Sequence, residues 1–360
     1  MKKYFNKYVS NTLASTQNQL RFVSDGTLQK GRVFFKAFAS GVYEHSFLFQ
    51  DTINSTYADG SITKVNETCG NWAIHSAKVI IFKGDFAHDM KNHEEPKNVI
   101  TLTFGDKAEK SVMAGESFIT DPVIFEIHKE EDWCVEVEFS GTQIPYFEEI
   151  IIPTYKEVNG EWVADKRMPL PCMIGVSRQV EKKIGFLGDS ITEGIGTECG
   201  SYTHWNAEIA KLVGDKYSYW NLGIGFARAA DAATNGAWLE KAKQMDVVTI
   251  CLGVNDMGRG YSATEIKCNL ESVVRILQEN KVRTILFTIP PFDYDEKSKA
   301  KWLDVNSHIM NNLSKITEVY DVVSIWGDKA PNEERAIYGG HPNAEGCLKL
   351  AKDFVEKVKL

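Results

Sequence analysis

The chain changes its pattern at about residue 178, and from there to its end short apolar runs alternate with stretches typical of helices. The apolar runs are 184–187, 219–222, 247–252, 284–289 and 319–325, and the helical stretches are 201–212, 227–242, 265–278, 297–316 and 344–358. Strands that alternate with helices pair in parallel and are covered by helices on both faces. The pattern therefore predicts an α/β domain with a parallel sheet over residues 178–360.

The preceding residues, 1–177, predict a different architecture. Short β segments lie at 33–35, 42–49, 72–82, 99–104, 123–127 and 134–139, and strongly helical stretches are scarce. In the last segment apolar Val135, Val137 and Phe139 alternate with Glu136 and Glu138, which is the pattern of a strand with one buried face. We expect a β-sandwich of the jelly-roll kind. A linker is expected at the prolines of 169–171 and the polar stretch 177–183.

Length and composition fit two globular domains. A chain of 360 residues exceeds what a single ordinary core organises. Hydrophobic residues make up 43% and charged residues 25%, as in soluble globular proteins. The net charge of -8 and the lack of a basic cluster exclude a nucleic-acid surface. No apolar run approaches the length of about 18 residues that a membrane span needs, so no membrane partner is expected.

The compartment follows from the N-terminus and the cysteines. The first residues are charged, but polar Ser10, Asn11 and Thr12 follow where a signal peptide would have its apolar region. The seven cysteines are odd in number and scattered, at positions 69, 134, 172, 199, 251, 268 and 347. Reduced thiols in a cytoplasmic protein fit this pattern.

Gly188-Asp189-Ser190 ends the first apolar run of the α/β region. A turn of this composition is common before a helix, because glycine permits the turn while aspartate and serine cap the helix that follows. A serine becomes a nucleophile only when a base removes its proton, and His341 near the C-terminus is a candidate for that base.

The ends of the other strands carry further candidates. Asn221-Leu222-Gly223 follows the second strand, Gly253-Val254-Asn255-Asp256 follows the third, and Gly339-Gly340-His341-Pro342 follows the fifth. Because parallel strands deliver these loops to the same edge of the sheet, we expect them to converge. In chain order, Ser190, Gly223, Asn255 and His341 resemble the four signature positions of the SGNH hydrolases, also called GDSL esterases. The resemblance covers residues 180–360.

This resemblance implies a three-layer α/β/α domain in which Ser190 is the nucleophile and His341 the general base. It also implies an oxyanion hole made of the backbone N–H groups of Ser190 and Gly223 and the side-chain amide of Asn255. Such donors stabilise the charge that develops on the carbonyl oxygen. Glycine at 223 lets the backbone approach closely, and a neutral amide donates without a counter-charge. Neither a metal nor an organic cofactor is required.

One position departs from the family pattern. The family places an aspartate three residues before the histidine, and here that position is Tyr338. Three interpretations follow: a Ser190-His341 dyad whose imidazole is oriented by a backbone carbonyl, a substitute acid, or an inactive descendant. The candidates for a substitute acid are Asp328, Glu333 and Glu334. We favour the dyad, because a carbonyl accepts the same imidazole proton as the missing carboxylate.

A segment of the first domain bears on the substrate. Residues 115–123 resemble a segment in front of the catalytic domain of two-domain SGNH esterases with an N-terminal β-sandwich, which are similar to carbohydrate esterases that remove acetyl groups. The expected function is hydrolysis of small acyl esters, an acetylated sugar above all, through an acyl-Ser190 intermediate. A thioesterase or lysophospholipase is the enzymatic alternative, and a sugar-binding protein with a decayed site is the alternative from another class. No oligomeric state follows from the sequence.

Two acids next to the signature residues have a structural interpretation. Asp189 and Asp256 are adjacent in sequence to Ser190 and Asn255, and we expect them to fix their own loops by local hydrogen bonds.

Cys199 lies near the catalytic loop but has no neighbour that would activate a thiolate, so it is a weak rival nucleophile.

Six further candidates are weaker than their structural alternatives. His88-Asp89 and His93-Glu94 suggest a metal site, but they lie in a charged stretch that is typical of a solvated loop. His204 and Trp205 could line the pocket, and packing is the preferred interpretation. Arg228 and Arg259 could meet an anionic substrate, and we prefer surface salt bridges for both.

Overall fold

The computed structural model of the protein describes residues 1–55, 65–82, 96–129, 131–327, 336–338 and 340–360. The chain divides into two compact units, Met1–Gln179 and Val180–Leu360. Each has its own hydrophobic core. No helix in the described part of the chain combines the length and the apolar character needed to cross a membrane.

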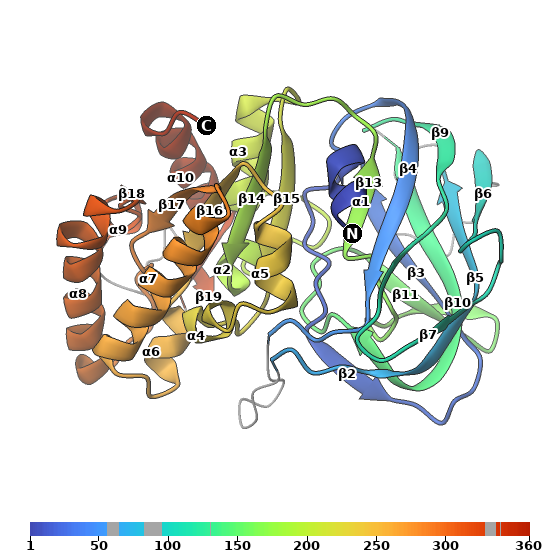
Figure 1. The fold of residues 1–360 in the computed structure, drawn as a ribbon, viewed down its shortest axis with the longest axis horizontal. Helices are drawn as coiled ribbons and strands as arrows, with labels where there is room; N and C mark the ends of the chain where they lie inside the picture. Colours follow the sequence, from blue (N-terminus) through green and yellow to red (C-terminus); the bar gives the residue numbers. More distant parts are fainter. Residues whose placement is uncertain (56–64, 83–95, 130, 328–335, 339) are drawn as a thin grey trace. The chain divides into compact units, whose positions relative to one another are not determined.

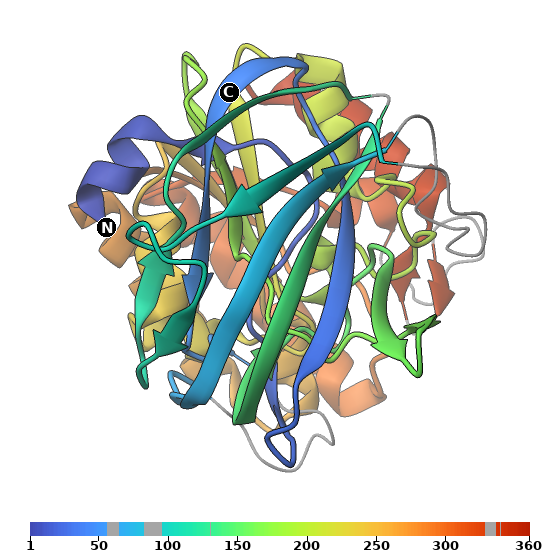
Figure 2. The same ribbon diagram turned by 90° about the vertical axis from the view of Figure 1, so that its right-hand side faces the viewer.

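The first unit follows a short helix, α1 (Lys2–Lys7), and within its described residues consists of two antiparallel sheets. One sheet has the order β1 (Val9–Ser10), β13 (Met173–Val176), β4 (Gly41–Gln50) and β8 (Ser117–Ile119), and β9 (Val123–Ile127) also pairs with β4. The other has the order β12 (Glu161–Ala164), β11 (Thr154–Val158), β3 (Gln29–Lys36), β10 (Asp132–Tyr146), β5 (Gly70–Ile81) and β6 (Asn98–Leu102), with β2 (Leu20–Val23) on β10 and β7 (Lys110–Val112) on β5. The neighbouring strands β3, β10 and β5 run side by side in Figure 2, in dark blue, green and light blue.

Aromatic side chains join the two sheets of the first unit. Trp133 of β10 stacks on Phe35 of β3, with 5.0 Å between ring centroids, and meets Phe47 of β4 edge to face at 6.3 Å. Phe47 belongs to the other sheet, so these rings fill the space between the inner faces. The predicted β-sandwich is confirmed.

The segment 154–176 differs from the expectation. It holds three strands that the pattern did not indicate, β11, β12 and β13, and β13 pairs with β4 inside the sandwich. The predicted linker is therefore wrong in its first part, because Cys172 and the strand after it are tied to the first unit; the Cys172 N–H donates to the Leu48 carbonyl at 2.7 Å. Short strands of mixed polarity at a sheet edge give little periodicity.

The second unit contains the predicted parallel sheet. Its order is β15 (Ser218–Gly223), β14 (Lys183–Gly188), β16 (Val247–Cys251), β17 (Arg283–Phe287) and β18 (Glu318–Tyr320), and all of these pairs are parallel. The helices are α2 (Ser190–Glu193), α3 (Trp205–Val213), α4 (Ala229–Ala233), α5 (Ala237–Ala242), α6 (Val254–Gly258), α7 (Ala263–Glu279), α8 (Glu296–Asn311), α9 (Val323–Trp326) and α10 (Ala344–Lys357). Helices α3 and α10 pack against each other, while α7 packs against α4 and α8 (Figure 1). The predicted α/β fold class is confirmed.

Two predicted elements of this unit are shorter than expected. The strand expected over 319–325 ends at Tyr320, and residues Val323–Trp326 form α9, whose Val323 N–H donates to the Asp321 carboxylate at 3.2 Å. The helix expected over 227–242 is split into α4 and α5. Asn235 has a positive φ of 59° and Gly236 caps α5, so the chain cannot continue as one helix there.

The strand order places the ends of three strands together. Strand β14 lies between β15 and β16 and pairs with both, so the chain first moves to one side of β14 and then crosses to the other. Gly188 at the end of β14 is in register with Gly223 of β15 and with Cys251 of β16. In open α/β sheets, ligands bind at this reversal, outside the carboxyl ends of the strands.

Candidate active site

Ser190 is the first residue of α2, directly after β14. Asp189 caps this helix, and its Oδ1 atom accepts the Ile191 N–H at 3.0 Å. Gly188 allows the sharp turn, since a Cβ at this position would lie 2.7 Å from the Cys251 carbonyl oxygen and 2.6 Å from the Thr192 side chain. The local role predicted for Asp189 is confirmed, and the turn leaves the Ser190 hydroxyl at the carboxyl edge of the sheet.

His341 is brought to Ser190 from 151 residues away. It lies in β20 (His341–Pro342), which pairs with β19 (Ala336–Tyr338) before α10 begins. The distance between Ser190 Oγ and His341 Nε2 is 2.8 Å. This is the separation that a general base needs in order to take the serine proton.

The imidazole is held between two further segments. The ring of Phe292, in the loop after β17, meets it edge to face with 5.3 Å between centroids. On another side, the backbone of Gly196 comes so close that a Cβ there would lie 3.1 Å from His341 Cβ and 2.6 Å from the Pro342 carbonyl oxygen. Only 9% of His341 is exposed, so its ring has little freedom to turn. Neither Phe292 nor Gly196 belongs to a signature block, and nothing in the sequence distinguished them.

Gly223 presses against the backbone of α2. A Cβ on Gly223 would lie 2.6 Å from both Glu193 Cα and the Thr192 carbonyl carbon, and closer still to the Glu193 nitrogen. Its own N–H donates to Asn221 Oδ1 at 2.9 Å. A donation from Gly223 to an oxyanion therefore has to share or replace this bond.

Asn255 is the second residue of α6, directly after β16. Its side-chain nitrogen donates to the Ala227 carbonyl at 2.9 Å, which fixes the amide against the loop that follows β15. A primary amide carries two N–H groups, so this bond uses one of them. The structure thus joins Asn255 to the loop after Gly223, as the convergence of strand ends predicts.

The residue in the position of the family's aspartate is Tyr338, whose backbone pairs with His341 across the β19–β20 ladder. The substitute acids considered above, Asp328, Glu333 and Glu334, lie outside the described residues. The dyad oriented by a backbone carbonyl stays a prediction, as do its two alternatives.

Asp256 has longer-range partners than the sequence indicated. Its carboxylate is fully buried and accepts the N–H groups of Ala229 at 2.9 Å and Ala230 at 3.2 Å, which lie 27 and 26 residues earlier in the chain. Burial raises the pKa of Asp256 to about 6, against the lowering effect of these two bonds. The prediction of a purely local role was wrong, because the loops that follow neighbouring strands meet here.

Arg228 is not a surface residue. Its guanidinium and Asp231 form an ion pair in which Arg228 is 6% and Asp231 4% exposed, with an Nε–Oδ2 distance of 3.0 Å. Its Nη1 atom lies 3.4 Å from the Tyr261 hydroxyl. The salt bridge was predicted correctly, but its location at the surface was wrong for Arg228. Arg259 is exposed.

The remaining candidates make no contact with Ser190 or His341 that the structure records among its described residues. Trp205 is completely buried, and its Nε1–H donates to the Ile191 carbonyl at 3.1 Å, so the packing role is confirmed. His204 is buried at the start of α3, and Cys199 is exposed. His88-Asp89 and His93-Glu94 lie outside the described residues. The part of the chain that the structure describes holds no group of three or more side chains suited to a metal ion.

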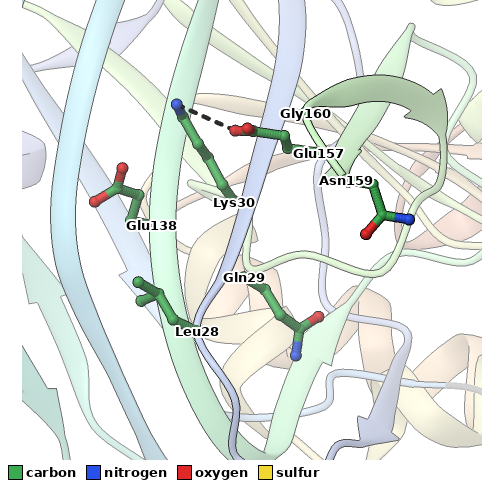
Figure 3. A pocket seen from close by; sticks show the side chains of 7 residues that line it. All are labelled: Leu28, Gln29, Lys30, Glu138, Glu157, Asn159 and Gly160. Atoms are coloured by element: carbon green, nitrogen blue, oxygen red, sulfur yellow. Dashed lines mark ion pairs between the residues drawn. The ribbon is translucent and has the colours of Figure 1, made fainter.

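A polar pocket of about 370 Å³ lies in the first unit (Figure 3). Its lining consists of Leu28, Gln29, Lys30, Glu138, Glu157, Asn159 and Gly160. Lys30 and Glu157 form an ion pair across it at 3.3 Å. None of the predicted site residues belongs to this lining.

Comparison with known proteins gives a family for the second unit. Residues 186–347 match the family described as GDSL-like Lipase/Acylhydrolase. The chain matches no curated protein sequence.

Several solved structures are similar to half of the chain. They include a lipolytic protein of the G-D-S-L family from Veillonella parvula, with 19% identity over 49% of this chain and 97% of that one and a TM-score of 0.42. The esterase EstA from a Pseudoalteromonas species has 19% identity over 49% and 97%, with a TM-score of 0.41. A carbohydrate esterase family 3 protein from Talaromyces cellulolyticus has 20% identity over 50% and 100%, with a TM-score of 0.40.

The family match covers the segment that carries all four signature positions, from the end of β14 to the start of α10. It confirms the resemblance on which the site was predicted. Residues 186–347 form a GDSL-like lipase/acylhydrolase domain, and the chain is an ester hydrolase.

Proposed function

We propose that this ester hydrolase is a serine esterase that removes small acyl groups, with an O-acetylated carbohydrate as substrate. Ser190 is the nucleophile and His341 its general base. The observation that carries the proposal is the 2.8 Å contact between Ser190 Oγ and His341 Nε2 at the edge of the sheet where the strand order reverses. The odd number and scattered positions of the seven cysteines support a cytoplasmic location.

The first half of the reaction forms an acyl enzyme. His341 Nε2 takes the proton of the Ser190 hydroxyl while Ser190 Oγ attacks the ester carbonyl carbon. The tetrahedral intermediate collapses as the bond to the sugar oxygen breaks, and this oxygen takes the proton from His341. The sugar leaves with a free hydroxyl, and the acetyl group stays on Ser190.

The second half returns the enzyme to its starting state. A water molecule attacks the acyl carbonyl carbon and gives its proton to His341 Nε2. Collapse of this second intermediate breaks the bond to Ser190 Oγ, which takes the proton back, and acetate leaves. Each half of the reaction involves two proton transfers, one to and one from the His341 imidazole. The reaction therefore balances without a cofactor.

The negative charge of both intermediates lies on the former carbonyl oxygen. We assign its stabilisation to the N–H groups of Ser190 and Gly223 and to the amide of Asn255. Support comes from the register of Gly188 with Gly223 and from the bond between Asn255 and Ala227, which together draw three strand ends into one place. Loss of one such donor costs about a hundredfold to a thousandfold in kcat.

The orientation of His341 does not need a carboxylate in this proposal. Phe292 and the backbone at Gly196 restrict the ring. We assign the acceptor of its remaining N–H to a backbone carbonyl. The wrong tautomer costs roughly ten-thousandfold in a serine protease that lacks its aspartate, and a carbonyl that accepts the proton avoids most of this loss.

The test is hydrolysis of a chromogenic acetate and of an acetylated sugar by wild type, Ser190→Ala and His341→Ala. We expect kcat to fall by about 10⁴-fold or more in both variants. Ser324→Ala is the matched control, because Ser324 is exposed and lies in the same unit; it should retain full activity. If the Ser190→Ala variant retained hydrolytic activity, the mechanism would be refuted.

The acyl preference is tested with the same wild-type enzyme. Acetate, butyrate and octanoate esters of one chromogenic alcohol are compared by kcat/KM, followed by thioesters of the same acids. We expect the acetate to be the best substrate and the sugar ester to exceed the chromogenic one. A preference for octanoate or for the thioesters would replace the proposed substrate by that of a lysophospholipase or a thioesterase.

A further inference from the structure

Two adjacent residues at the start of α6 form hydrogen bonds with one short segment after β15. One of them donates to this segment and the other accepts from it. Asn255 donates to the carbonyl of Ala227 at 2.9 Å, whereas Asp256 accepts the N–H groups of Ala229 at 2.9 Å and Ala230 at 3.2 Å. The segment 227–230 is therefore held at its start by the amide and at its end by the carboxylate.

The hydrogen bonds to the Asp256 carboxylate restrain this segment more strongly than the bond from the Asn255 amide. Bonds from N–H groups to a charged acceptor are worth roughly twice those between neutral groups. Asp256 is completely buried, so water cannot replace either of its partners. If the carboxylate were neutral, one of its two bonds would be lost, and the segment with the acceptor that fixes the Asn255 amide would be held less firmly.

Titratable side chains on the elements around Asp256 have partners of their own. They are Arg228 before α4, Asp231 in α4, Tyr261 after α6, Glu265 on α7 and Lys301 on α8. Arg228 pairs with Asp231, Glu265 with Ser262, and the Lys301 ammonium donates to the carbonyls of Met257 and Tyr261 at 3.3 and 2.7 Å. Arg228 lowers and Asp231 raises the pKa of Asp256, so their pair leaves little net charge to hold the carboxylate ionised.

We propose that Asp256 is the positioning residue for Asn255, and that protonation of Asp256 switches off the contribution of Asn255 to catalysis. This inference rests on the proposed function. Asp256 does not touch the substrate; it acts through the segment 227–230, whose carbonyl at Ala227 fixes the amide that donates to the oxyanion.

The sign of the pH effect follows from burial. Burial raises the pKa of Asp256 to about 6, so the carboxylate is ionised above pH 6 and accepts both N–H groups. As the pH falls through 6, the proton occupies one oxygen and one of the two bonds is lost. Activity on the acid side therefore depends on the ionisation of Asp256.

The first test is a double-mutant cycle with Asp256→Asn, Asn255→Ala and the double variant. We expect Asn255→Ala to lower kcat by about a hundredfold to a thousandfold, and Asp256→Asn to lower it by about tenfold to a hundredfold with KM unchanged. If Asp256 acts through Asn255, the double variant is no slower than Asn255→Ala. Losses that multiply would overturn the proposal.

Asp295→Asn is the matched control for the cycle. Asp295 also caps a helix in the same unit, with its Oδ1 accepting the Ser298 N–H at 2.7 Å, but it lies at the exposed start of α8. This variant should keep the wild-type kcat. A comparable loss in Asp295→Asn would mean that the cycle reports helix stability rather than the position of Asn255.

The second test does not require the Asp256 variant to fold. The acid limb of kcat/KM is measured for wild type and for Asn255→Ala. The wild type should show an ionisation near pH 6 that is absent from Asn255→Ala, because Asp256 then has no amide left to position. Identical limbs in the two proteins would refute the proposal. Since Ser190→Ala tests the nucleophile separately, an inactive Ser190→Ala together with identical limbs would leave the proposed function standing.

Discussion

Replacement of Gly223 by alanine tests whether the turn after β15 fixes the nucleophile. The added Cβ would lie 2.6 Å from Glu193 Cα and from the Thr192 carbonyl carbon, where ordinary contact begins at 3.4 Å. Both are backbone atoms of α2 and cannot swing away. The turn and α2 must therefore separate by at least about 0.8 Å.

The consequence for catalysis follows from the position of Ser190 on the same short helix. A displacement of about 1 Å of a reacting group costs roughly a hundredfold in rate. We expect Gly223→Ala to lower kcat/KM by about a hundredfold. The strain of overpacking should lower the free energy of unfolding by about 1–3 kcal/mol, which leaves the chain folded at 25 °C.

The assay is ester hydrolysis, with circular dichroism and urea unfolding on the same samples. Gly258→Ala is the matched control, because Gly258 has a negative φ and no atom within 4 Å of an added Cβ. This control should keep the activity of the wild type. If folded Gly223→Ala hydrolysed the ester within about threefold of the wild-type rate, the close approach of the turn to α2 would have no role in the site.

Two further predictions concern the histidines. Phe292→Ala should lower kcat by about tenfold and Phe292→Leu by less, because the edge-to-face contact that restricts the His341 ring is worth about 0.5–1.5 kcal/mol; equal kcat values for both variants and wild type would remove Phe292 from the site. His45 is stacked on Phe125, and burial lowers its pKa to about 4, so the folded protein resists its protonation and should lose about 3 kcal/mol of stability as the pH falls from about 6.5 to 4. His45→Phe should flatten this pH dependence in urea unfolding, and an unchanged slope would contradict the assignment.

The site could be predicted from the sequence because its residues stand where strands end. A parallel sheet delivers the loops after its strands to one edge, so a serine, a glycine and an amide in three successive loops converge in any chain with this topology. His341 joins them from β20, outside the parallel sheet, and contacts Ser190 at 2.8 Å.

Contacts between loops that are distant in the sequence could not be predicted. Asp256 looks like a local cap, and its bonds to Ala229 and Ala230 exist only because two loops meet in space. The apolar run 319–325 predicts one strand, but the chain leaves the sheet after Tyr320 and forms α9. In the sequence, nothing distinguishes Phe292 from other aromatic residues in loops. Its contact with the His341 ring is apparent only in the structure.

The most direct measurement of the central claim is the acyl enzyme itself. Wild type, Ser190→Ala and His341→Ala are mixed with a chromogenic acetate, quenched in acid during turnover and digested for mass spectrometry. The account predicts one acetyl group on the wild-type peptide that contains Ser190, a trace in His341→Ala and none in Ser190→Ala. An acetyl group on another residue, or rapid turnover without an acetylated Ser190 in any quench, would contradict it.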